Sequence, residues 1–104
     1  MNILDIIEEF KEKIKDEFGE LVCKFYLFGE YARGNYKEYP SVKIALIVKR
    51  KMIRSEWEKV ESIASEMCEK YGGPFYVFEI ELEKFESEKS PLAKIVKREG
   101  FEIM

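Results

Sequence analysis

Residues 25–34 read Phe-Tyr-Leu-Phe-Gly-Glu-Tyr-Ala-Arg-Gly, and residues 41–48 read Ser-Val-Lys-Ile-Ala-Leu-Ile-Val. An apolar run therefore stops at Gly29, and a second one begins after a polar connection that ends at Pro40. Glycine allows the backbone to turn sharply or to approach a ligand where a Cβ would clash. If residues 30–33 form one helical turn, the free N–H groups at its start suit a phosphate. The stretch predicts two strands joined by a loop with the backbone of a phosphate site.

The motif Gly-x-x-Ala-Arg-Gly between two apolar strands resembles the minimal nucleotidyltransferases of the DNA polymerase beta type. In that family a Gly-Ser pair opens the loop, which holds a nucleoside triphosphate, and the next strand carries Asp-x-Asp. Mg²⁺ prefers oxygen ligands, and residues i and i+2 of a strand share one face, so two such carboxylates can hold catalytic metals. The resemblance implies a nucleotide loop at Gly29, Glu30, Arg33 and Gly34.

The positions that match the metal ligands of the family carry other side chains. Lys43 and Ala45 stand where the family keeps its two aspartates, and Glu30 replaces the serine of the loop. A charged lysine cannot ligate Mg²⁺, alanine has no ligand atom, and Glu30 would repel a triphosphate. The third catalytic carboxylate of the family falls on Phe78 or Glu79. The resemblance and these losses together predict a degenerate, non-catalytic domain without a metal site.

The former cleft is expected to contain Lys43, Ala45 and Glu79, on the outward face of the second strand and on a partly open face of the third. We hypothesise that the Lys43 ammonium takes the place of a metal and pairs with Glu79 or Glu30. The alternative is that Lys43 extends to water from an edge strand. Arg33 is expected either to contact a nucleotide phosphate or to form a salt bridge that supports the loop.

The resemblance favours a protein-interaction module. Family members are often paired with a small helical HEPN protein in toxin–antitoxin-like systems, so a HEPN-like chain is the expected partner. A homodimer is also expected if the second strand or residues 101–104 present an exposed sheet edge.

Two other functions stay open. One is an active Mg-dependent nucleotidyltransferase with shifted carboxylate ligands at Glu30, Glu79 or Glu81. The other is a nucleotide-binding regulatory domain without turnover, in which the loop binds the nucleotide. Its binding residues would be Gly29, Arg33, Lys43 and the loop tyrosines Tyr31, Tyr36 and Tyr39. Magnesium and ATP are expected as cofactors only in these alternatives.

Length, charge and composition limit the number of domains, the kinds of partner and the cellular compartment that the sequence fits. Its 104 residues fit a single nucleotidyltransferase-like domain, 1–104, and the net charge of −3 provides no basic field for nucleic acid. The basic run at residues 49–51 is expected to be a solvated loop, with a docking patch for an acidic partner or RNA as the alternative. No signal peptide or membrane-length apolar run is present, which favours a cytoplasmic protein in which Cys23 and Cys68 pack as small apolar groups. The absence of histidine excludes histidine-rich zinc sites and histidine-based triads.

Periodicity and capping signals supply the element order. Apolar residues recur at helical spacing from Ile3 to Phe18, and Ser55 with Glu58 is the signature of a capping box for a helix that ends near Tyr71. Ser90-Pro91 is typical of another helix start. The predicted order is α-β-loop-β-α-β-α, an α/β (α+β) fold with a small mixed sheet covered by helices. The predicted strands are residues 21–28, 41–48 and 75–82, residues 83–89 are a charged connection, and residues 101–104 are an edge strand or a tail.

Overall fold

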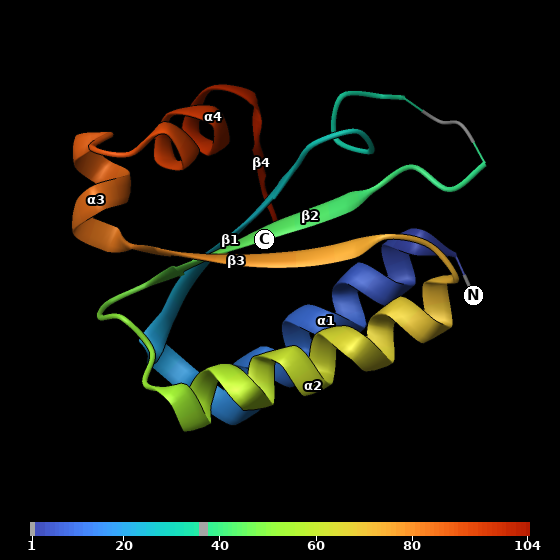
Figure 1. Ribbon diagram of the computed structural model, residues 1–104, viewed down its shortest axis with the longest axis horizontal. Coiled ribbons are helices and arrows are strands. Elements are labelled where there is room, and N and C mark those ends of the chain that lie inside the picture. The colour runs from blue at the N-terminus through green and yellow to red at the C-terminus, as the bar shows by residue number, and fades with distance from the viewer. Residues whose placement is uncertain (1, 36–37) are drawn as a thin grey trace.

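The computed structural model describes residues 2–35 and 38–104. In chain order the elements are α1 (Ile3–Phe18), the 3₁₀ turn η1 (Gly19–Leu21), β1 (Val22–Phe28), β2 (Val42–Val48), α2 (Arg54–Tyr71), β3 (Phe75–Glu81), α3 (Leu82–Ser87), α4 (Pro91–Glu99) and β4 (Phe101–Glu102). Within these residues the strands form one sheet in the order β3-β2-β1-β4 (Figure 1). Strand β1 is antiparallel to β2 and β4, and β2 is parallel to β3. The predicted mixed sheet is confirmed.

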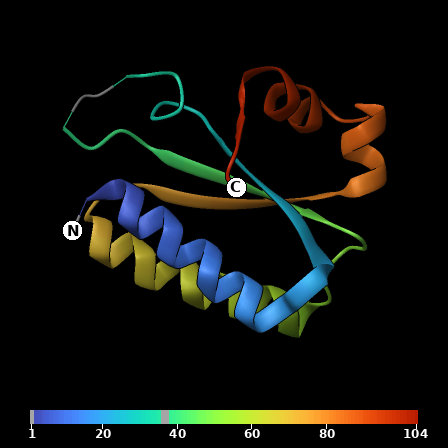
Figure 2. The same cartoon turned by 180° about the vertical axis from the view of Figure 1, so that it is seen from behind.

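Helices cover both faces of the sheet. Helices α1 and α2 lie side by side on one face, as the two opposite views show, and α3 and α4 lie on the other (Figures 1 and 2). The α1/α2 face encloses the larger core, which includes Ile14, Leu46 and Met67. The α3/α4 face encloses a second, smaller core around Ile47, Phe85 and Val96. Strand β2 contributes to both cores, which explains its nearly continuous apolar sequence.

Helix ends follow local capping chemistry. The Asn2 side chain accepts a hydrogen bond from Asp5 N, and Gly72 ends α2 with a φ of 79°. The prediction of Ser55 as an N-cap is wrong, because α2 begins at Arg54 with Ile53 as N-cap. Isoleucine has no acceptor atom, so the stabilising contact there is a hydrogen bond from Ile53 N to the Glu56 carboxylate.

The segment predicted as a charged connection forms helix α3. Its short apolar face is Leu82 and Phe85, and Phe85 is only 3% exposed. The structure also corrects the prediction that the second strand is a sheet edge, because β2 lies between β1 and β3. The edges are β3 and the two-residue β4. Across the described residues, every helix is too short or too polar to span a bilayer.

Candidate functional site

The strand register brings three of the relevant positions to one face. Residues paired across a sheet share a face, and Lys43 pairs with Tyr76 while Ala45 pairs with Phe78. Lys43, Ala45 and Phe78 therefore point toward the α3/α4 side of the sheet. Of the two candidates for the third family position, Phe78 is therefore the one that lies beside Ala45 on the same face.

Glu79 lies on the opposite face. It pairs with Leu46, which belongs to the α1/α2 core, and its Oε2 accepts a hydrogen bond from Met52 N at 3.0 Å. The expectation that Glu79 shares a cleft with Lys43 and Ala45 is therefore wrong. The physical reason is the two-residue period of a strand, in which a shift of one position reverses the face. The glutamates of β3 also do not mark an open side of the former cleft, since their face is the one that α1 and α2 cover.

Ala45 is closed in by aromatic rings. Its exposed fraction is 0%, and it belongs to the core that contains Phe28, Ile80 and Phe85. The rings of Phe28 and Phe78, from β1 and β3, lie with centroids 5.5 Å apart on this face of the sheet. The expectation that the face of Ala45 is an open cleft floor is therefore wrong. Helices α3 and α4 supply the cover through Phe85, Ala93 and Val96.

Lys43, on the same face, is half-buried. Its stem packs against Gly29, where a Cβ would stand 3.0 Å from the Lys43 Cδ. Gly29 has a φ of 87°, a conformation that L side chains rarely adopt. Within residues 2–35 and 38–104, Lys43 forms no ion pair, and Glu79 lies on the other face of the sheet. The hypothesised ion pair of Lys43 with Glu79 or Glu30 is therefore not formed among these residues.

The loop after β1 is held by its own hydrogen bonds. Arg33 N donates to the Gly29 carbonyl at 3.0 Å, and Gly34 N donates to the Tyr31 carbonyl at 3.1 Å. Glu30 Oε1 accepts a hydrogen bond from Ser41 N at 3.0 Å, across the loop. The Glu30 carboxylate thus joins the two ends of the loop, a role that the motif alone does not reveal.

The remaining loop side chains have different surroundings. Arg33 is exposed and, among the described residues, forms no side-chain hydrogen bond or ion pair, so the expected supporting salt bridge is not formed there. Tyr39 packs against Tyr71 with ring centroids 6.1 Å apart. Tyr31 packs against the α1/α2 core. Tyr36, the third loop tyrosine of the sequence prediction, lies outside the described residues.

Tyr71 anchors the far end of the loop. Its hydroxyl donates a hydrogen bond to the Pro40 carbonyl at 2.6 Å. Burial raises the pKa of Tyr71, and the nearby Tyr31 and Glu30 add to this effect. The hydroxyl therefore stays protonated at neutral pH and remains a donor to the loop.

The residues at the matching positions do not fit Mg²⁺. Lys43, Ala45 and Phe78 provide no oxygen, and the rings of Phe28 and Phe78 occupy the space beside Ala45. Elsewhere in the described part of the chain, no group of three or more histidine, cysteine, aspartate or glutamate side chains lies close enough to hold a metal ion. The aromatic pair is the feature that sequence reasoning missed; its signal was the alternation that places Phe28 and Phe78 on the Ala45 face.

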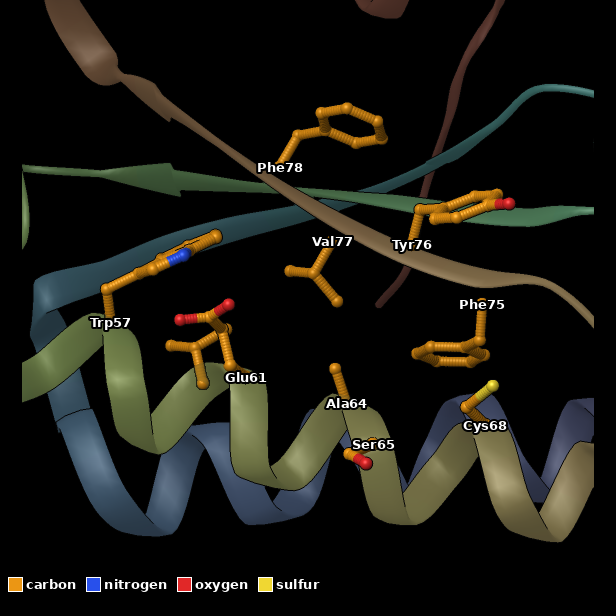
Figure 3. Close-up of a pocket in the computed structure, with 10 residues that line it drawn as sticks. Trp57, Glu61, Ala64, Ser65, Cys68, Phe75, Tyr76, Val77 and Phe78 are labelled. Carbon is orange, nitrogen blue, oxygen red and sulfur yellow. The ribbon is translucent and has the colours of Figure 1, made fainter.

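A groove lies at the β3 edge of the sheet, where helix α2 packs against this strand. It measures about 370 Å³ and runs between α2 and β3 (Figure 3). Val77 and Phe75 point from β3 toward the helix, and Trp57 leans over the same space from the start of α2 (Figure 3). The lining is mostly apolar, with Glu61 and Ser65 as its polar members from the helix. No sequence motif marked this groove.

Comparisons with known proteins agree with the architecture. No protein-family model matches the chain. A Methanocaldococcus jannaschii protein named "Putative protein adenylyltransferase MJ0141" is 38% identical over 71 residues, which cover 68% of this chain and 72% of that protein. A crystal structure of "the toxin-antitoxin with AMP-PNP" aligns over 91% of this chain and 70% of that one, with a TM-score of 0.63 and 18% identity. A "putative nucleotidyltransferase from Sulfolobus solfataricus" aligns over 96% and 78%, with a TM-score of 0.59 and 16% identity.

Proposed function

Because this chain belongs to the minimal nucleotidyltransferase family, we propose that it is a degenerate member that keeps the fold and serves as a protein-interaction module. The observation that carries this proposal is the chemistry of one sheet face. Lys43 and Ala45 stand where the family keeps its two aspartates, and Phe78 lies beside Ala45 on the same face. A cation, a methyl group and a phenyl ring cannot coordinate the ions on which phosphoryl or nucleotidyl transfer depends.

The loop supports the same proposal. Glu30 stands where the family has a serine, and its carboxylate is used to join the loop ends through Ser41 N. A carboxylate at this position opposes the approach of a triphosphate. Arg33 remains exposed at the loop, but a lone arginine without metals is a weak site for a triphosphate.

The partner is proposed to be a protein. One structural neighbour comes from a crystal structure of a toxin-antitoxin. The family resemblance implies a small helical HEPN protein as the partner. A module that has lost transfer but retained its surface could still bind such a chain. We therefore propose a HEPN-like helical partner and assign no nucleotide cofactor to the complex.

Calorimetry with ATP and Mg²⁺, followed by a transfer assay with labelled ATP, tests the loss of catalysis. The expected result is no metal-dependent heat and no label on protein or RNA. Binding with label transfer would establish the alternative of an active enzyme with shifted carboxylates. Binding without transfer would establish a nucleotide-binding regulatory domain.

Co-expression with a HEPN-like chain encoded beside this one tests the partner. The expected result is a complex that elutes as one species in size-exclusion chromatography and persists after ATP and Mg²⁺ are removed. Two separate peaks would contradict the proposed partner while leaving the catalytic assignment unaffected.

A further inference from the structure

In the part of the chain that the structure describes, strand β3 has an unpaired edge along its whole length. It pairs with β2 at every position from Phe75 to Glu81, and β2 lies on one side only. The Pro74 carbonyl, one residue before the strand, accepts a hydrogen bond from Val42 N at 2.9 Å. Because backbone groups alternate sides along a strand, Tyr76, Phe78 and Ile80 also point their N–H and C=O groups at β2. The outward groups therefore belong to the alternate residues, which are Phe75, Val77, Glu79 and Glu81.

Most of the features that usually protect such an edge are missing from β3. Natural edge strands carry proline, charged side chains (lysine above all) or a bulge, or are very short, and of these β3 has only the charges of Glu79 and Glu81. Residues 75–81 contain no proline or lysine, and the register to β2 is unbroken over seven pairs. The β4 edge, in contrast, is two residues long. Tyr76 is 50% exposed on β3, and the apolar groove beside α2 runs along the same edge. An edge of this kind is a template for pairing with another strand.

The sequence of β3 is complementary to itself. In an antiparallel pairing of two copies centred on Phe78, each Glu79 faces Val77 of the partner subunit and each Glu81 faces Phe75 of the partner subunit. On the other face, Tyr76 meets Ile80 of the partner subunit, and the two Phe78 rings meet at the two-fold axis. All seven residues pair in this register, and no glutamate faces another.

A shifted register is less favourable. Centring the pair on Glu79 would place two carboxylates directly opposite each other, which is destabilising across a ladder. It would also leave Phe75 without a partner. Aromatic and β-branched pairs, by contrast, stabilise antiparallel strands, and the Phe78-centred register provides them.

We propose that two copies of this chain associate through β3, antiparallel and centred on Phe78, to form one continuous sheet across a two-fold axis. The contact is isologous, because the same edge serves both copies. Lys43 lies on β2, one strand away from the contact, and the loop that follows β1 does not belong to the paired strands. This dimer requires neither the loss of catalysis nor the HEPN-like partner.

Cysteine cross-linking tests the register, in a parent variant in which Cys23 and Cys68 are replaced by alanine. Two Cα atoms opposite each other in a non-hydrogen-bonded antiparallel pair lie about 4.5 Å apart, within disulfide range. Phe78→Cys should therefore give a covalent dimer on mild oxidation. Tyr76→Cys is the matched control, since the two copies of residue 76 would lie roughly 13 Å apart along the strand. It should cross-link no more than the parent.

Sedimentation velocity of the unmodified chain tests the association itself. The expected mass is twice 12.4 kDa, falling to the monomer on dilution. Val77→Pro removes an outward N–H that β2 does not use, so it should give a folded monomer, as judged by circular dichroism. A monomer at every concentration, or a dimer that Val77→Pro leaves intact, would overturn the proposal. Equal cross-linking through residues 76 and 78 would overturn the register.

Discussion

The stem of Lys43 lies against the backbone of Gly29, at the point where β1 ends and the loop begins. A Cβ on Gly29 would stand 3.0 Å from the Lys43 Cδ and 3.3 Å from its Cγ. In the family this glycine belongs to the nucleotide loop. Here its backbone conformation, at a φ of 87°, and the lysine stem give it a structural reason that needs no nucleotide.

Replacing Gly29 by alanine should lower the free energy of unfolding by about 1–3 kcal/mol, because the residue must hold a positive φ and also displace Lys43. The measurement is urea denaturation followed by circular dichroism. The double variant Gly29→Ala/Lys43→Ala separates the two causes. It should recover only part of the loss relative to Lys43→Ala alone, since the flexible stem can move and the backbone strain remains. Complete recovery would contradict the assigned backbone cost.

Introducing the family's aspartates at positions 43 and 45 should lower the free energy of unfolding by unequal amounts. Ala45 is 0% exposed within the α3/α4 core, so Ala45→Asp buries a carboxylate among apolar side chains. The expected loss is about 3–5 kcal/mol at neutral pH, the range for an uncompensated buried charge. Lys43 is only half-buried, so Lys43→Asp should lower the free energy of unfolding much less.

The comparison of these two variants by denaturant unfolding at pH 7 checks how fully the former site is closed. Ala45→Asn is the uncharged control of similar size, and it should lose less stability than Ala45→Asp. Equal stability of Ala45→Asp and Lys43→Asp would mean that the space beside Ala45 admits water, contrary to the aromatic cover.

Ion pairs between α1 and α2 should make the stability of the fold decrease as the pH falls. The Lys13 ammonium hydrogen-bonds both Glu66 oxygens, at 2.8 and 3.0 Å, and lowers the pKa of Glu66 below its ordinary value near 4.5. A carboxyl group whose folded pKa is lowered stabilises the fold above its unfolded pKa and loses that contribution as pH falls toward the folded pKa. Glu66→Gln should therefore reduce stability at pH 7 and weaken its decline below pH 4.5.

Thermal unfolding measured from pH 7 to pH 2.5 tests this sign. The side chains are partly exposed, so the effect should be small and should shrink further in high salt. Glu69→Gln, on α2 outside this network, is the control and should follow the unmodified protein. A Glu66→Gln variant that matched the unmodified chain at pH 7 and fell more steeply in acid would contradict the assignment.

Much of the architecture could be predicted from the sequence. Helical spacing gave α1 and α4, and the apolar runs gave the three longer strands. The alternation in β2 also placed Lys43 and Ala45 on one face, opposite Leu46, as the register shows. These predictions succeeded because each depends only on the spacing of apolar residues within one helix or strand, and the tertiary structure keeps that spacing.

The site could be predicted only in part, because it depends on pairing between strands. A single sequence could not distinguish Phe78 from Glu79 as the neighbour of Ala45, and the two lie on opposite faces. The cover over Ala45 was missed for a related reason. Helix α3 has six residues, four of them polar, and its C-cap is Glu88 at a φ of 51° rather than the usual glycine. Tertiary packing, not local propensity, stabilises so short a helix.

The packing of α3 and α4 over Ala45 leads to a prediction for the stability of α3. Phe85 is the buried anchor of α3, with its ring centroid 5.0 Å from that of Tyr26 and the Lys97 ammonium 5.5 Å from its own centroid. Because six residues cannot form a stable helix alone, Phe85→Ala should cost about 3–5 kcal/mol in urea denaturation and release α3 from the sheet. Amide exchange should then rise across residues 82–87. Ile95→Ala on α4, where the side chain is 45% exposed, is the control and should cost about 1 kcal/mol or less. Equal losses for the two variants would mean that α3 does not hold the cover over Ala45.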